Sequence, residues 1–200
     1  RTGFYVYGDD VVLFPISFSI PKHRILRELP EKTAFVVNDS WKSFQIKHYR
    51  FGPLEEEAYF RDLQKHRFGD TRRKGGHDCL RHYEMLASGC IPIFENYENM
   101  PRSILTTLPS ELLLRAKALY ALPWTNTETG PGECPSEPAA YESLGTELLR
   151  YTAQHLSTES SARRLLETLG SSPQEEPKVL FLTCKAFDLF PSYLTASVFH

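Results

Sequence analysis

The sequence lacks a long apolar run and a strong net charge. No stretch approaches the ~18 consecutive apolar residues of a membrane-spanning helix, so we expect no membrane span. The formal net charge of −2 gives no general attraction to nucleic acid or to an anionic membrane. One basic cluster, at 72–74, is short and has no interleaved aromatic side chains, so we do not expect a nucleic-acid partner.

Motifs built on cysteine and glycine are also missing. The four cysteines form no C-x-x-C pair, which argues against a zinc site. Cys79 and Cys90 fall on apolar segments, and we interpret them as buried thiols rather than a disulfide, which favours a reducing compartment. The pattern G-x-G-x-x-G is absent, so a dinucleotide-dependent oxidoreductase is a poor candidate.

The residues that are present suffice for a core, since 41% are hydrophobic and 12% aromatic. Strand-like and helix-like segments alternate along the chain, which predicts an α/β fold with a Rossmann-like parallel sheet flanked by helices. The predicted strands are 11–20, 33–39, 66–71 and 91–94. The predicted helices are 55–66, 78–88, 108–122 (with Ser110 as N-cap), 139–156 and 159–169.

The pattern also predicts a division of the chain. Residues 1–170 would form one lobe with a helical C-terminal part, and 171–177 would be a linker. Residues 178–200 begin with the β-rich run KVLFLTC, which either opens a further, truncated Rossmann-like unit or adds a strand to the first sheet. The chain does not start with methionine and stops within an apolar pattern, so we interpret it as a fragment.

The helix predicted at 78–88 has two different faces. Asp78 is a good N-cap residue and Gly89 a good residue to follow the helix end. The apolar face, expected to pack on the sheet, comprises Leu80, Tyr83, Leu86 and Ala87. The opposite, polar face comprises His77, Arg81, Glu84 and Ser88.

The start of this helix is a candidate anion site. Free N–H groups and the helix dipole favour a phosphate there, and Gly75 and Gly76 let the backbone approach it closely. Lys74 and Arg81 add positive charge. Glu84 lies ~10 Å along the helix, where its carboxylate can accept hydrogen bonds from a ribose diol. Together they predict a nucleoside diphosphate lying along the helix.

The same residues also fit a purely structural interpretation, and spacing alone does not separate the two. Paired glycines are common in turns, and an Arg/Glu pair three residues apart is often a surface ion pair worth about 0.2–0.5 kcal/mol. His77 would then cap the loop.

The ordered series K-G-G-H-D-C-L-R-H-Y-E-M-L-A-S-G-C-I-P-I-F, continuing to Glu98, Asn99 and Pro101, resembles the donor-binding half of GT-B glycosyltransferases. It looks closest to exostosin-like and to algal and viral glycosyltransferase-like proteins, and the match covers roughly 66–120. The resemblance implies a GT-B-type lobe in which Glu84 holds the ribose and the glycine loop, with Lys74 and Arg81, serves the diphosphate. His77 departs from the family, where an aromatic such as tryptophan is expected, and as a donor-site residue it is suited to stacking on a ring, to donating to a phosphate or to capping the loop.

The implied activity is transfer of a sugar from a nucleotide-diphosphate sugar to the hydroxyl of a glycan or protein acceptor. The absence of D-x-D argues against a diphosphate-bound Mg²⁺, so we expect neither a metal nor another cofactor. We identify no general base, because the candidates fit turns or caps better: Asp9, Asp10, His23 and Asp39. Localisation stays open between the cytoplasm and the Golgi.

Two other functions would use the same contacts. A sugar-nucleotide epimerase binds the same diphosphate and ribose, and a degenerate GT-B-like lobe would bind a sugar nucleotide or glycan without turnover. We expect Glu84→Ala to weaken nucleotide binding with the fold intact, and Gly89→Val to damage folding, because a β-branched residue resists positive φ.

Overall fold

The structure is a computed structural model that describes part of the chain. The described residues are 5–7, 11–13, 16–37, 51–52, 54–71, 76–101, 104–122, 139–168 and 170. The predicted linker at 171–177 and the unit at 178–200 lie outside these residues, so both stay predictions.

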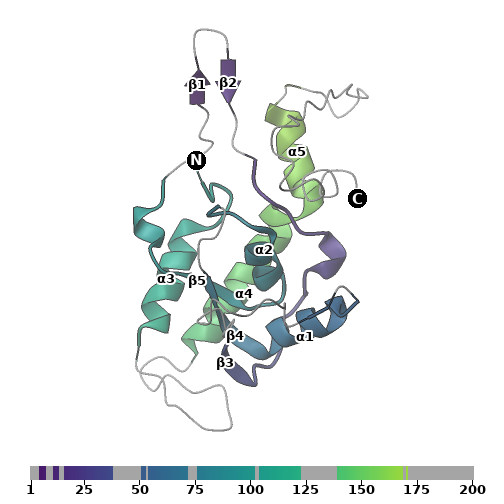
Figure 1. The fold of residues 1–200 in the computed structure, drawn as a ribbon, viewed down its shortest axis with the longest axis vertical. Coiled ribbons are helices and arrows are strands. Elements are labelled where there is room, and N and C mark those ends of the chain that lie inside the picture. Colours follow the sequence, from purple (N-terminus) through teal and green to yellow (C-terminus); the bar gives the residue numbers. More distant parts are fainter. Residues whose placement is uncertain are drawn as a thin grey trace.

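Three strands form a parallel sheet at the centre of the described chain (Figure 1). They are β3 (Ala34–Val37), β4 (His66–Thr71) and β5 (Ile91–Phe94), in the order β3-β4-β5. Phe68 in the central strand is aligned with Val36 on one side and Ile91 on the other. The predicted parallel sheet is confirmed for these three strands, and the α/β fold is consistent with a Rossmann-like architecture.

The first predicted strand belongs to a different sheet and is shorter than expected. β1 (Tyr5–Tyr7) and β2 (Val11–Leu13) pair as an antiparallel hairpin, which stands apart from the parallel sheet in Figure 1. The prediction of one strand over 11–20 is wrong at its C-terminal end, where Ile20 makes an isolated bridge to Ser157. The sequence has a proline at position 15, and a proline has no backbone N–H to donate to a strand pairing.

The predicted helices are all present, with ends that move by a few residues. They are α1 (Glu56–Lys65), α2 (Leu80–Ala87), α3 (Ser110–Tyr120), α4 (Ala140–Tyr151), the π-helical turn η3 (Thr152–Leu156) and α5 (Thr158–Thr168). Two short 3-10 turns are η1 (Lys22–Arg24) and η2 (Tyr97–Asn99). None of the helices in the described part of the chain is long and apolar enough to span a membrane.

Both N-cap predictions are wrong. The N-cap of α2 is Cys79, and the carboxylate of Asp78 instead accepts a hydrogen bond from the hydroxyl of Tyr83 at 3.2 Å. The N-cap of α3 is Pro109, and the hydroxyl of Ser110 accepts a bond from the hydroxyl of Tyr97 at 3.1 Å. In both cases the side chain that was expected to cap the helix is hydrogen-bonded to a tyrosine hydroxyl instead.

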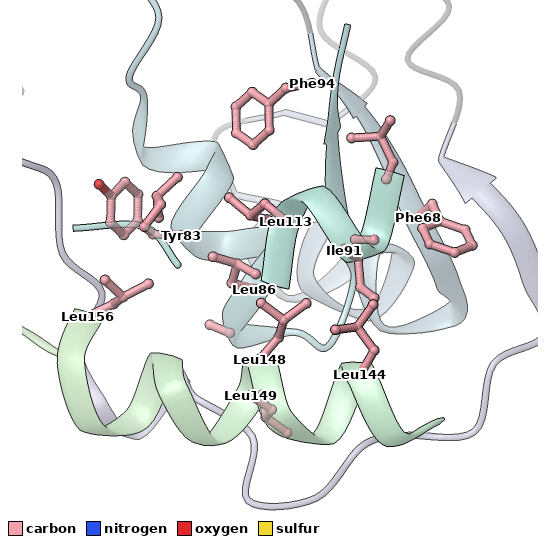
Figure 2. Packing of buried hydrophobic residues seen from close by; sticks show 14 of the residues in the cluster. Phe68, Tyr83, Leu86, Ile91, Phe94, Leu113, Leu144, Leu148, Leu149 and Leu156 are labelled. Carbon is pink, nitrogen blue, oxygen red and sulfur yellow. The ribbon is translucent and has the colours of Figure 1, made fainter. Parts of the chain in front are cut away.

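The main core joins the sheet to α2, α3 and α4. All four side chains of β5 are buried, which is typical of a parallel strand covered on both faces. Figure 2 shows Leu144 and Leu148 of α4 pointing toward the sheet and α2. A smaller cluster of Leu63, Met85 and Cys90 lies between α1 and α2, packed against the partly buried Tyr59.

The segment 20–33 runs past the C-terminal end of α2 and closes it off. The amide of Leu26 donates to the carbonyl of Ala87 at 3.0 Å. Leu29 lies against Gly89, which follows α2 with a φ of 66°, so the positive φ predicted for this glycine is confirmed. Ser88 was predicted on the polar face but is fully buried, because this segment covers it.

Tyr141 of α4 forms a hydrogen bond to the residue that follows the C-terminal end of α2. Its hydroxyl is buried and donates to the carbonyl of Gly89 at 2.8 Å. Tyr141→Phe leaves that carbonyl buried without this donor, so we expect a loss of about 1–3 kcal/mol in the free energy of unfolding. Urea denaturation measures it, and an unchanged midpoint at an unchanged slope would contradict the role given to this bond.

Candidate functional site

The candidate site lies where α2 begins. The chain passes from β4 to α2 to β5, so α2 is the crossover helix between two parallel neighbours of the sheet. The N-terminus of α2 therefore lies at the edge where the parallel strands end. Ligands of open α/β sheets bind at this edge. α1 precedes β4 in the same way, so α1 and α2 both begin at this edge and pack side by side.

The predicted glycine loop is described only at its end. Lys74 and Gly75 lie outside the described residues. Gly76 is exposed, and a Cβ added there would meet the carbonyl oxygen of Asp78 at 3.9 Å, an ordinary contact distance. Packing within the described chain therefore gives no reason for a glycine at this position. His77 is half-buried at the start of the turn that enters α2.

Arg81 and Glu84 are both half-buried and lie close enough on α2 for their charges to interact, and Glu84 faces α1. The hydroxyl of Tyr59 in α1 donates to Oε2 of Glu84 at 2.7 Å. Burial raises the pKa of the Glu84 carboxyl, while the Tyr59 bond and the Arg81 charge oppose that rise. The carboxylate of Glu84 thus lies where α1 packs against α2, and its remaining lone pairs can accept hydrogen bonds from further donors.

Tyr59 is a site residue that sequence reasoning missed. Tyr59 is half-buried on α1, next to the buried Phe60 and Leu63. Its tie to Glu84 joins positions 25 residues apart, which no local spacing reveals. The bond also changes one expectation, because Glu84→Ala would remove the acceptor of a largely buried hydroxyl as well as a ligand contact.

A second cluster surrounds the first turn of α2. Sγ of Cys79 lies 3.4 Å from Nε2 of His82, and Nδ1 of His82 lies 3.8 Å from Oδ1 of Asp78. The ring of His82 also packs edge-on against Phe94 of β5, with 4.7 Å between ring centroids. The interpretation of Cys79 as a buried thiol is wrong, because Cys79 is partly exposed, whereas Cys90 is buried as expected. Both are free thiols.

The segment after β5 makes its contacts with α3. Glu98 of the E-N-x-P segment is exposed and pairs with Lys117, whose Nζ lies 2.6 Å from Oε1. The same ammonium donates to the carbonyl of Glu95 at 3.2 Å. The hydrogen bond from Lys117 lowers the pKa of Glu98. In this structure Glu98 therefore anchors the turn η2 to α3.

The candidates for a base or for metal ligands remain without an assignment. His23 is exposed on η1, and Asp9, Asp10 and Asp39 lie outside the described residues. Across the described ranges, no group of three or more histidine, cysteine, aspartate or glutamate side chains is placed to hold a metal ion.

No family model, curated protein or solved structure matches this chain. The α/β fold is therefore established by the structure alone, and the glycosyltransferase resemblance depends on the residues of the sequence itself.

Proposed function

We propose that this chain is the nucleotide-sugar-binding lobe of a metal-independent, GT-B-type glycosyltransferase. The observation that carries the proposal is the position of the Arg81–Glu84 pair, on a crossover helix whose N-terminus lies at the carboxyl edge of a parallel sheet. The ordered series from Lys74 to Phe94 supports it, because its polar residues are those that a diphosphate and a ribose require.

The proposed contacts follow the direction of α2. The diphosphate would lie at the helix start, against free N–H groups, the glycine loop with Lys74, and the guanidinium of Arg81. The ribose would lie farther along, where Glu84 accepts from its hydroxyls. Tyr59 holds that carboxylate in one orientation through the 2.7 Å bond, which reduces the side-chain entropy lost on binding.

The proposed reaction is displacement at the anomeric carbon. The bond to the diphosphate breaks, and positive charge at the helix start stabilises the departing anion. An acceptor hydroxyl of a glycan or protein attacks the same carbon and loses its proton to a general base. We assign that base to no described residue.

The proposal predicts saturable binding of one nucleoside diphosphate. Calorimetric titration of the chain with UDP, GDP, CDP and ADP, with and without Mg²⁺, should select one base and show no metal requirement. Removing a charge-assisted contact costs about 1.5–3 kcal/mol, so Arg81→Ala and Glu84→Ala should each weaken binding by about 10-fold to 100-fold.

Two further variants separate ligand contact from structure. Glu84→Gln keeps an oxygen that accepts from Tyr59 but loses the negative charge, so it should stay folded and still bind more weakly. Tyr59→Phe removes the same hydrogen bond and leaves the carboxylate, so it should retain most binding. If Tyr59→Phe weakens binding as much as Glu84→Ala, the carboxylate has a structural role and the ribose assignment fails.

Product assays separate the proposed function from the alternatives. A transferase releases the free nucleoside diphosphate only with an acceptor, whereas an epimerase converts the donor sugar alone. Binding with neither reaction in the intact protein would identify a non-catalytic lobe. A well-folded intact protein that binds none of the four diphosphates would contradict the proposal.

A further inference from the structure

Three ionisable side chains that the proposed donor contacts do not use lie at the start of α2, two just before the helix and one in its first turn. They stand in a row, with the thiol of Cys79 at 3.4 Å from Nε2 of His82 and Nδ1 of His82 at 3.8 Å from the carboxylate of Asp78. His82 is 3% exposed, and its Nδ1 has no hydrogen-bond partner among the described residues. A buried imidazole is thus aimed at a carboxylate on one side and at a thiol on the other.

We propose that Cys79 is a reactive thiolate, held by His82 and oriented through Asp78, and that it is a site of oxidation by hydroperoxides. The thiol is the N-cap residue of α2, so the positive end of the helix dipole favours its ionised form. It is partly exposed, which a reagent needs in order to reach it. This inference does not depend on nucleotide binding.

The groups around the pair favour charge on both members. Burial raises the pKa of Cys79, but the hydrogen bond and charge of His82 and the nearby backbone N–H groups bring it below its ordinary value. Burial lowers the pKa of His82, but the nearby carboxylate of Asp78 and the interaction with Cys79 raise it above its ordinary value. From α1, Tyr59 faces Cys79 as a neutral hydroxyl, since burial and the charge of Glu84 raise its pKa.

The reaction balances with the peroxide as the only co-reactant. The Sγ thiolate attacks one peroxide oxygen, an S–O bond forms, and the O–O bond breaks. The sulfur is oxidised to a sulfenic acid, and the departing oxygen is reduced and leaves as hydroxide from hydrogen peroxide or as alkoxide from an organic hydroperoxide. The proton of the His82 imidazolium neutralises that anion to water or to an alcohol.

Cys90 is the matched control within the same chain. It is fully buried, and burial raises its pKa to about 12, so it should be protonated and shielded wherever Cys79 is ionised. The two thiols lie eleven positions apart in the sequence, at the start of α2 and just beyond its end. Peptide mass spectrometry reads them separately once a protease has cut between them.

Pulse alkylation of the full chain with iodoacetamide tests the ionisation. Across a pH series, Cys79 should react at least about tenfold faster than Cys90 near neutral pH, with a midpoint below the free-thiol value of about 8.5. The same cysteine in the urea-unfolded chain supplies the reference rate. A midpoint at or above that of the unfolded chain would overturn the proposal.

Asp78→Asn tests the orienting carboxylate without emptying the core. It removes the charge that raises the pKa of His82, so the Cys79 midpoint should rise toward the free-thiol value. Glu111→Gln removes an exposed carboxylate from the first turn of α3 and should leave the midpoint unchanged. Equal midpoints in wild type and Asp78→Asn, with circular dichroism showing both folded, would refute the role of Asp78 and His82.

Hydrogen peroxide with dimedone, which traps sulfenic acids, tests the oxidation itself. The dimedone adduct should form on Cys79 before Cys90, and His82→Gln should slow it. Where His82→Gln does not fold, Asp78→Asn serves the same comparison. Absence of an adduct on a Cys79 that alkylates rapidly would overturn the assignment of a hydroperoxide substrate.

Discussion

Gly89→Val is expected to lower the free energy of unfolding by about 3–5 kcal/mol, a large part of the total of about 5–15 kcal/mol that a domain has. The first cause is backbone strain. Gly89 has a φ of 66°, in the left-handed region that costs a residue with a Cβ about 1–2 kcal/mol. Valine adds branching at Cβ, which makes this region still less accessible.

The second cause is the crowding at the end of α2. A Cβ on Gly89 would come within 2.8 Å of a methyl carbon of Leu29 and 3.1 Å of the ring of Pro30. Leu29 is itself held between this corner and α4, and overpacking of this kind costs about 1–3 kcal/mol. Pro30 has little freedom to move away, since its ring is rigid.

Two other glycines separate the two causes. Gly170 has almost the same φ, 68°, with nothing within 4 Å of an added Cβ, so Gly170→Ala reports strain without crowding. Gly145 lies inside α4 and would meet both Leu29 methyl carbons at 3.1 Å, so Gly145→Ala reports crowding at ordinary helical φ, offset by about 1 kcal/mol of helix propensity that alanine gains over glycine. Urea denaturation should rank Gly89→Ala as the most damaging of the three. If Gly89→Ala lowers the free energy of unfolding no more than Gly170→Ala does, crowding by segment 20–33 contributes nothing.

The sequence predicted those features of the fold that short-range patterns encode. The β-rich runs that became β3, β4 and β5 are bounded by turn residues or helical patterns, and the two faces of α2 follow from its spacing. Gly89 was recognisable because a helix end needs a positive φ that glycine supplies cheaply. Tyr83, Leu86 and Ala87 were correctly predicted to be buried, because helix spacing puts them on the apolar face of α2.

The features that sequence reasoning missed depend on contacts between distant segments. Ser88 falls on the polar face by helical geometry, yet segment 20–33 crosses over it and buries it. Asp78 is a residue type that often caps helices, but its carboxylate accepts a hydrogen bond from the hydroxyl of Tyr83 instead. Glu84 was expected beside a ribose, and its partner within the chain, Tyr59, comes from another helix. Such pairings depend on how α1, α2 and segment 20–33 pack together, which local periodicity does not contain.

The Cys79–His82 pair is a case where the sequence did carry a signal. Residues 78, 79 and 82 stand at i, i+1 and i+4, which places the carboxylate and the thiol one helical turn from the imidazole. The helix spacing that places Arg81 and Glu84 on one face does not include this pair, and a cysteine within an apolar pattern is buried more often than it is reactive.

Lys32 should make the stability of this protein rise with pH above about pH 8. Its ammonium group is buried, donating to the carbonyls of Gln64 at 2.9 Å and Ser88 at 3.3 Å. Burial is the largest effect and lowers the pKa of Lys32 from 10.5 to about 8; Cys90 opposes this shift, and the Arg67 charge adds a smaller lowering. Between those two values the unfolded chain binds more protons than the folded one, so unfolding becomes harder as pH rises.

The expected size follows from the same two pKa values. From about pH 7 to about pH 9.5, the Lys32 contribution to the free energy of unfolding should increase by about 2 kcal/mol. Cys90 acts in the opposite direction, because burial raises its pKa to about 12 while the unfolded thiol ionises above about 8.5. The pH dependence of the free energy of unfolding of the wild type therefore contains the opposing contributions of Lys32 and Cys90.

Lys32→Met isolates the lysine together with its interaction with Cys90, because the rest of the Cys90 contribution is common to both proteins and cancels in their difference. Urea denaturation of both at several pH values should show the wild type gaining about 2 kcal/mol relative to Lys32→Met by about pH 9.5. Lys65→Met removes the same charge from an exposed position at the end of α1 and should show no such trend. If the difference between wild type and Lys32→Met stays flat across this range, the ammonium is solvated as well when folded as when unfolded. The polar contacts at the end of α2 would then hold a charged lysine without penalty.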